Sequence, residues 1–255
     1  MFHLAKCAEA QAFRLVEHGE VTSTNEEALL RANAGDPGRL WVVAKSQTAG
    51  RGRNGRTWSS PAGNLYASLL LLNPALPHKA PELGFVAGIA AAHTIRAILR
   101  RGDRVRIKWP NDVLFDGAKC CGILIESALL CDGQLACTAG IGVNCRAHPQ
   151  NTPYPATDLM AISGNAIEAK QVFAELSGSM AHWLGVWAAG AGFALIRTEW
   201  LSLASGVGTR VRVALPSHTI EGIFRTIDAS GRLVLERPGE TLTIGAGDVF
   251  QCIVS

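Results

Sequence analysis

The chain has 255 residues, which suits one large domain or a main domain with a small appendage. Apolar residues make up 48% of it, so it can bury a sizeable core and is not a disordered protein. The formal net charge of +3 is too small to indicate nucleic-acid binding by itself.

The sequence shows no targeting or membrane segment. Charged and polar residues interrupt the first fifteen positions, unlike the apolar middle of a signal peptide. No run approaches the roughly 20 apolar residues that a membrane span needs. The seven cysteines are odd in number and lack paired metal-ligand spacing, so we expect free, mostly buried thiols. These features predict a cytoplasmic protein with no membrane partner.

Strands and helices alternate through the first three quarters of the chain. The elements predicted there are a strand at 13–21, a helix at 25–34, strands at 40–45 and 65–72, a helix at 82–100, strands at 105–108, 113–115, 122–130 and 135–141, and a helix at 166–189. Asp116-Gly117 and Asp132-Gly133 are hairpin turn signals between the later strands. This order predicts an α+β domain over residues 1–203 with a mixed, largely antiparallel sheet.

The pattern changes after Trp200. Five short strands are predicted at 210–213, 220–227, 233–235, 242–244 and 249–253. So many short strands in about fifty residues favour a small β-barrel domain over residues 204–255.

Three arginines and three glycines gather in AGRGRNGRTWSSP, residues 49–61. They are Arg51, Arg53, Arg56, Gly50, Gly52 and Gly55. Planar guanidinium groups suit carboxylate or phosphate, and glycines let the backbone approach a ligand closely. A solvated loop or a contact to single-stranded nucleic acid would fit this stretch as well. Trp58 could stack on a flat base or pack as an ordinary core tryptophan.

Three further segments carry polar groups at strand ends. In Lys108-Trp109-Pro110-Asn111-Asp112, the last two residues could contribute oxygen ligands to Mg²⁺, or form an ordinary turn. Lys119 begins an apolar strand, where a lysine is often a flanking charge. Gly140-Ile141-Gly142-Val143-Asn144 ends a strand with glycines that permit close ligand approach.

Five segments taken together resemble the biotin protein ligase family. They are Ser23-Thr24-Asn25, the loop GRGRNGRTW at 50–58, KWPNDV at 108–113, the K-x-x-G-I-L-x-E segment at 119–126, and GIGVN at 140–144. The resemblance begins near residue 13, is highly specific from 47 to 144, and is loose over the last fifty residues. It implies a catalytic domain like those of biotin ligases and class II aminoacyl-tRNA synthetases.

The resemblance also implies an activity and roles for individual residues. The reaction would join biotin and ATP into biotinyl-5′-AMP and then pass biotin to a lysine of a biotin carboxyl carrier domain. The implied biotin contacts are Ser23, Thr24, Asn25, Gln47, Gly50, Arg51, Gly52, Arg53, Lys119, Gly122 and Gly140. The implied nucleotide contacts are Arg53, Arg56, Trp58, Lys108, Asn111 and Asn144. Arg53, Lys108 and Lys119 would be catalytic, with Asp112 near Mg²⁺.

The resemblance has departures and competitors. About a dozen residues precede the first strand, too few for the DNA-binding module of some relatives, so no nucleic-acid partner is expected. Gln251 and Cys252 stand where some relatives have an arginine. Some relatives form homodimers by pairing their sheets edge to edge, and the sequence leaves open whether this chain forms a homodimer in the same way. A lipoate or octanoyl ligase, a nucleic-acid-binding regulator and a non-catalytic biotin sensor are the competing interpretations.

Overall fold

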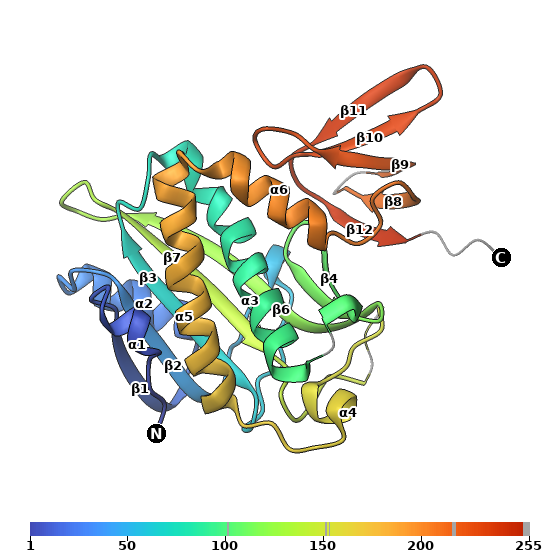
Figure 1. The fold of residues 1–255 in the computed structure, drawn as a ribbon. Helices are drawn as coiled ribbons and strands as arrows, with labels where there is room; N and C mark the ends of the chain where they lie inside the picture. The colour runs from blue at the N-terminus through green and yellow to red at the C-terminus, as the bar shows by residue number, and fades with distance from the viewer. Residues whose placement is uncertain (101, 151, 153, 216–217, 252–255) are drawn as a thin grey trace.

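Two β-sheets organise the chain, the larger covered by helices and the smaller built from the C-terminal strands (Figure 1). The structure is a computed structural model, and it describes all residues except 101, 151, 153, 216, 217 and 252–255. The large sheet has seven strands: β1 (Arg14–Val21), β2 (Leu40–Gln47), β3 (Leu65–Leu72), β4 (Val105–Lys108), β5 (Asp112–Phe115), β6 (Ala118–Leu129) and β7 (Leu135–Val143). The helices beside it are α1 (Lys6–Glu9), α2 (Thr24–Asn33), α3 (Leu83–Leu99), α4 (Leu159–Ser163), α5 (Ala169–Trp187) and α6 (Phe193–Leu203).

The large sheet is mixed, as the sequence predicted. Its strand order is β1-β2-β3-β7-β6-β5-β4. β1 and β2 are parallel and are connected through α2, whereas every other neighbouring pair is antiparallel. β6 and β7 pair over nine residues each, which places their glycines side by side in the middle of the sheet.

Alternating side chains bury both faces of the sheet. Trp41 and Val43 in β2 face the main core under α3 and α5, while Leu40 and Val42 face a smaller cluster under α2. Figure 1 shows α3 and α5 crossing one face of the sheet. The helical stretch 77–99 is long and apolar enough to span a membrane by length and composition, but most of it is buried in this core.

The C-terminal strands form a separate antiparallel sheet, which we call the C-terminal sheet. Its members are β8 (Arg210–Ala214), β9 (Thr219–Ile227), β10 (Leu233–Arg237), β11 (Glu240–Ile244) and β12 (Asp248–Gln251). Their order is β11-β10-β9-β8-β12, so within the described residues the two end strands do not pair, and the predicted barrel is seen as an open sheet. Residues 252 and 253 of the predicted last strand lie outside the described residues.

The C-terminal sheet docks on the KWPND segment and the helices. Trp109 Nε1 donates a hydrogen bond to Gly231 O at 3.1 Å. Gly231 has a φ of +77°, and an added Cβ would lie 2.5 Å from the Phe85 ring, so glycine is required at this turn. Arg197 Nε in α6 donates to Ile227 O at 2.6 Å. These contacts bring the start of β12 to the edge of the large sheet.

Some elements differ from the sequence prediction. Helices α1, α4 and α6 were not predicted, and β6 begins at Ala118 instead of residue 122. The extra residues of β6 are held by long-range pairing, because Lys119 N donates to Pro155 O at 2.8 Å and Thr157 N donates to Lys119 O at 2.9 Å. Lys119 therefore lies inside a strand and not at a loose strand end.

Candidate active site

A pocket of about 750 Å³, including its open mouth, lies over the large sheet and under the arginine-rich loop. The residues that line it are Ser23, Thr24, Asn25, Gln47, Arg51, Gly52, Arg53, Arg56, Thr57, Trp58, Tyr66, Asn111, Asp112, Lys119, Gly122, Ile123, Leu124, Gly140, Ile141, Gly142, Tyr154 and Asp248. They come from the start of α2, the end of β2, the arginine-rich loop, β3, the start of β5, the middle of β6, the end of β7, the segment before α4 and the first residue of β12. The pocket has a neutral end and a charged end.

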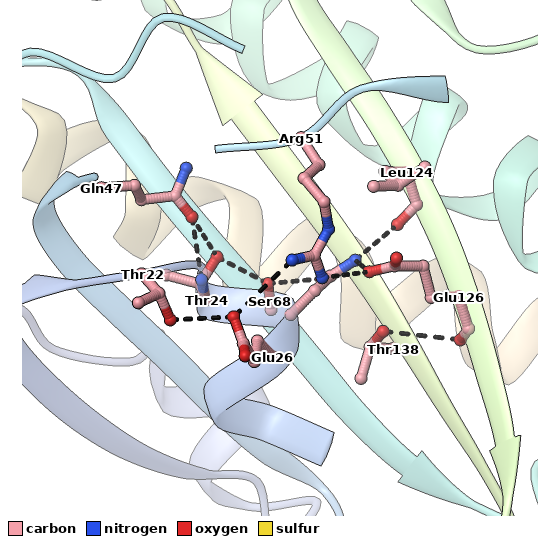
Figure 2. A network of polar contacts seen from close by, with 10 residues as sticks. Thr22, Thr24, Glu26, Gln47, Arg51, Ser68, Leu124, Glu126 and Thr138 are labelled. Atoms are coloured by element: carbon pink, nitrogen blue, oxygen red, sulfur yellow. Dashed lines mark hydrogen bonds and ion pairs between the residues drawn. The ribbon is translucent and has the colours of Figure 1, made fainter. Parts of the chain in front are cut away.

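The neutral end is a cluster of buried polar side chains (Figure 2). Ser68 Oγ lies 2.7 Å from Thr24 Oγ1 and 2.6 Å from Asn25 Oδ1. Gln47 Oε1 accepts from Thr24 N at 2.8 Å and also lies 3.1 Å from Thr24 Oγ1. The side-chain oxygens of Asn25 and Gln47 only accept hydrogen bonds. The hydroxyl groups of Ser68 and Thr24 therefore supply only two protons for the three oxygen–oxygen contacts. The cluster is one donor short, and an N–H group on a ligand would complete it.

Arg51 lies beside this cluster, between two carboxylates, as Figure 2 shows. Its guanidinium nitrogens are 3.6 Å from Glu26 Oε2 and 3.5 Å from Glu126 Oε2. Asn25 Nδ2 also donates to Glu126 Oε2 at 2.7 Å, which fixes the Asn25 amide with its oxygen toward Ser68. Arg51 thus closes the neutral end, away from the tip of its own loop.

The arginine-rich loop folds back on itself as a short hairpin. Gly52 N donates to Arg56 O at 2.7 Å, and Trp58 N donates to Gly50 O at 2.9 Å. Asn54 and Gly55 turn the tip with φ values of +56° and +71°. The hairpin lays Arg53 and Arg56 over the charged end of the pocket, where both approach Asp248 of β12.

Two lysines share one carboxylate at the charged end. Lys119 Nζ lies 2.6 Å from Asp112 Oδ1, and Lys108 Nζ lies 3.0 Å from Asp112 Oδ2. Burial alone would raise the pKa of Asp112, but the ammonium groups of Lys119 and Lys108 outweigh it and hold that pKa below its ordinary value. The carboxylate is therefore ionised at neutral pH and keeps both lysines at one point of the pocket.

Aromatic rings surround these lysines. Lys119 Nζ lies 5.2 Å from the Trp58 ring centre and 5.3 Å from that of Tyr154, which also lies 5.4 Å from Lys108 Nζ. Such contacts favour the charged form of an ammonium group without neutralising it. The Trp58 ring packs directly against the backbone of Gly142. A side chain there would not fit, since an added Cβ would lie 2.6 Å from Trp58 Nε1. The buried Nε1 has no hydrogen-bond partner among the described residues.

The thiols near this site are inert. Cys120 and Cys121 are fully buried beside Lys119 in β6. Burial raises the pKa of the Cys120 thiol to about 12 and that of Cys145 also to about 12. A thiol is a nucleophile as its thiolate, so these residues pack the core and do not react at neutral pH.

Comparisons with known proteins agree with this geometry. The sequence profile described as "Biotin/lipoate A/B protein ligase family" matches residues 18–144, and that described as "Biotin protein ligase C terminal domain" matches residues 206–250. A biotin--[acetyl-CoA-carboxylase] ligase of Paracoccus denitrificans is 37% identical over 236 residues, covering 89% of this chain and 96% of that protein. The chain belongs to the biotin protein ligase family.

Solved structures of biotin protein ligases share the fold. That from Aquifex aeolicus, in complex with biotin and ATP, has a TM-score of 0.77 and 28% identity, covering 93% of this chain and 97% of that one. That from Leishmania major, in complex with biotinyl-5-AMP, has a TM-score of 0.64 and 25% identity, covering 91% and 99%. The family resemblance drawn from the five motifs is thereby confirmed.

Most of the residues that the ligase motifs single out line the pocket, and three do not. Lys108 lies behind Asp112. Asn144 is buried at the end of β7, where its Nδ2 donates to Thr157 O at 3.0 Å. Gly50 supports the loop, since an added Cβ would lie 2.5 Å from both Ser60 Oγ and Trp58 O. Asn111 lies at the pocket wall, with Nδ2 donating to Ile123 O at 2.5 Å.

Reasoning from the sequence missed several residues of the site. They include Ser68, Glu126, Tyr154 and Asp248. Ser68 did carry a signal, because a lone hydroxyl interrupts the apolar strand LYASLLLL. Glu126 closes the K-x-x-G-I-L-x-E motif. Tyr154 and Asp248 lie in segments with no motif, and long-range folding alone brings them to the pocket.

Proposed function

We propose that the chain is an ATP-dependent ligase that forms biotinyl-5′-AMP and transfers biotin to a lysine of a biotin carboxyl carrier domain. The observation that carries this proposal is the division of one pocket into a neutral end short of hydrogen-bond donors and a cationic end. Biotin has the matching parts, namely a urea ring with two N–H groups and a carboxylate tail. The biotin–ATP and biotinyl-5-AMP complexes of relatives support the same assignment.

The neutral end would hold the urea ring. The single hydroxyl proton of Ser68 faces both Thr24 Oγ1 and Asn25 Oδ1, so one of these two oxygens lacks a donor, and a urea N–H supplies one. Ser23 is buried beside them. Gly140 lies under this ring site, where an added Cβ would be 2.5 Å from Asn25 Oδ1. These groups are neutral, as suits a neutral urea.

The charged end would bring two anions together. In the first step a carboxylate oxygen of biotin attacks the α-phosphorus of ATP, and pyrophosphate leaves with the electrons of the broken P–O bond. Lys119, Lys108 and Arg53 would offset the negative charge that gathers on the phosphorus oxygens. Burial lowers the pKa of Arg53 while Asp248 and Asp112 oppose that effect. Arg56 would meet the phosphate chain and Trp58 the adenine.

In the second step the protein would mainly position the reacting groups. The lysine amine of the carrier attacks the carbonyl carbon of the mixed anhydride, the C–O bond to the phosphate breaks, and AMP leaves while the amine loses a proton. Lys119 and Arg53 would stabilise the departing phosphate. The loop hairpin and Tyr154 would cover the anhydride and exclude water from it.

The protein side chains alone do not make a cage for Mg²⁺. Among the described residues no group of three or more His, Cys, Asp or Glu side chains could hold a metal, and both oxygens of Asp112 pair with lysines. Mg²⁺ usually binds through nucleotide phosphates plus one or two carboxylates. The metal would thus arrive on ATP, and an Asp112 contact to it stays a prediction.

Lipoate or octanoate activation is the second candidate, because the matching profile includes lipoate ligases. An acyl chain with a dithiolane ring offers no N–H donor to the neutral end. The donor-short cluster of Ser68, Thr24, Asn25 and Gln47 therefore favours biotin.

We propose that the chain acts on a small ligand and a carrier domain and has no nucleic-acid partner. The loop arginines pair with Glu26, Glu126 and Asp248 at the pocket, which supports a small-ligand role over nucleic-acid binding. A homodimer is proposed through β1, which lies at an edge of the large sheet. We also propose a cytoplasmic location with no membrane partner, since the apolar stretch 77–99 packs in the core.

A carrier-labelling assay tests the proposed function. The purified chain would be incubated with ATP, Mg²⁺ and a biotin carboxyl carrier domain, with either biotin or lipoate added. We expect a streptavidin signal on the carrier domain that needs ATP and biotin and disappears when the acceptor lysine is replaced by arginine. Acylation by lipoate but not by biotin, seen by mass spectrometry, would favour the second candidate.

A further inference from the structure

The cations of the pocket are nearly balanced by carboxylates of the chain itself. Five cationic side chains gather there, Arg51, Arg53, Arg56, Lys108 and Lys119, and four carboxylates pair with them, Glu26, Glu126, Asp112 and Asp248. Glu26, Glu126 and Asp112 belong to elements in or against the large sheet. Asp248 alone of these four comes from the C-terminal sheet.

Asp248 joins two arginines across the boundary between the two sheets. Arg56 Nη2 contacts Asp248 Oδ2, and Arg53 Nη1 lies 3.9 Å from the other carboxylate oxygen. Arg53 Nη1 also donates to Gly247 O at 3.3 Å, so β12 holds the loop tip through backbone and side chain together. We call the cluster of Asp248, Arg53 and Arg56 the latch.

In the latch, two guanidinium groups approach the two oxygens of one carboxylate. Paired arginines bind the oxygens of a phosphate in the same way. Asp248 lines the pocket itself, and its side chain is 28% exposed. Asn111 also touches the latch, because Arg53 Nη1 lies 3.5 Å from Asn111 Oδ1. The carboxylate of Asp248 therefore stands where these two arginines would receive an anionic ligand.

We propose that Asp248 is a positioning residue that holds Arg53 and Arg56 over the pocket as an internal stand-in for phosphate, and that ATP must displace it. This inference builds on the proposed function, in which these arginines meet the phosphates. Both anions cannot satisfy the same guanidinium N–H groups, so the carboxylate lowers the apparent affinity for ATP. In return the loop keeps its hairpin over the pocket without ligand, because the arginines have a partner.

The latch and a merely structural role for Asp248 predict opposite changes in ATP affinity when Asp248 is replaced. Replacing Asp248 by asparagine removes the competing charge but keeps the shape of the side chain. We expect Asp248→Asn to bind ATP at least about fivefold more tightly than the original chain, within the usual range of coupling between sites. A residue that only stabilises the loop would, when replaced, weaken ATP binding.

Isothermal titration of the full chain with ATP and Mg²⁺, without biotin, measures this difference. Asp248→Glu keeps the charge and should restore an affinity within about twofold of the original. Glu236→Gln is the matched control, because Glu236 is a half-exposed carboxylate of the same C-terminal sheet that pairs with Arg225 away from the pocket. A thermal unfolding scan shows whether each variant is folded, and biotin titration shows whether the neutral end, which does not touch the latch, is intact.

The outcomes separate the two proposals. Tighter ATP binding by Asp248→Asn, with Glu236→Gln unchanged, supports the latch. Equal or weaker ATP binding by an Asp248→Asn variant that still binds biotin overturns the latch and leaves the proposed function intact. Failure of the original chain to bind ATP in this titration overturns the latch, and failure in the carrier-labelling assay as well overturns the proposed function.

Discussion

The two ends of the pocket are built in different ways. At the neutral end, Thr24, Asn25 and Ser68 lie on α2 and β3 and are all buried, and their contacts stay within one sheet and its nearest helix. At the charged end, the cations lie on a loop, at the end of β4 and near the start of β6, and their partners include Asp248 from the other sheet. The hydrogen-bonding groups of the neutral end are therefore positioned by one sheet and its nearest helix. The charged end depends instead on segments that are distant from one another in the sequence.

The largest effect is expected at the charged end, from Lys119→Ala. The side chain is mostly buried and pairs with Asp112 in the pocket wall, whereas Lys108 lies behind Asp112 and does not line the pocket. We expect a loss of at least about 100-fold in the rate of adenylate formation, as for removal of one group that stabilises developing charge. Single-turnover kinetics would measure it. Lys170→Ala, at an exposed lysine, is the control, and a loss under threefold for Lys119→Ala would contradict the role.

Asp112, the carboxylate that Lys108 and Lys119 share, should stabilise the folded chain. The pKa of Asp112 is lowered in the folded chain, so its contribution to stability is full above the ordinary pKa of 3.8 and is lost as pH falls through the lowered value. Asp112→Asn leaves two lysines unpaired and should lower the melting temperature by about 5 °C or more at pH 7. The gap should close in strong acid. In thermal scans, a gap that does not narrow at any acid pH at which both proteins still fold would refute this account of the lysine pair.

At the neutral end, Gly140→Ala should produce the next largest effect. Its Cβ would lie 2.5 Å from Asn25 Oδ1 and would push that amide out of the cluster. We expect biotin to bind about tenfold more weakly with ATP binding unchanged. Gly19→Ala is the matched control, since its Cβ would meet nothing within 4 Å. An equal loss of ATP affinity would show that the two ends are not separate.

Ser68→Ala should give the smallest of these changes. It removes one of the two hydroxyl protons of the neutral cluster and leaves the shape of β3 intact. We expect KM for biotin to rise about fivefold with kcat unchanged, because about 1 kcal/mol of hydrogen bonding is lost before the chemical step. Ser46→Ala, at the exposed end of β2, serves as the comparison. A fall in kcat with an unchanged KM would place Ser68 in the chemistry instead.

Much of the site could be predicted from the sequence because its groups sit in short, contiguous motifs. The loop at 50–58, KWPND and GIGVN each keep their residues close along the chain, so the family resemblance could be drawn from them, although the residue types alone left a nucleic-acid contact or an ordinary turn open. The neutral end was expected through Thr24 and Gln47 because the resemblance implied their contacts with biotin. The motifs do not predict which carboxylate pairs with each cation.

The missing parts depend on contacts between distant segments. Asp248 is 192 positions from Arg56, and nothing in its neighbourhood suggests that it would reach the loop. Lys119 was expected at a loose strand end, but pairing with 155–157 draws it into β6. Helix α6 did have a signal, since Phe193, Ile196, Trp200 and Leu203 fall on one buried face, but the glycines at 190 and 192 hide its start.

Biotin-dependent exchange of labelled pyrophosphate into ATP tests the central claim most directly, because it needs a carboxylate and the α-phosphate to meet in one pocket. The account predicts that the purified chain catalyses exchange when biotin is present, and that Lys119→Ala abolishes it. Exchange that proceeds equally without biotin, or that responds to lipoate and not to biotin, would contradict it.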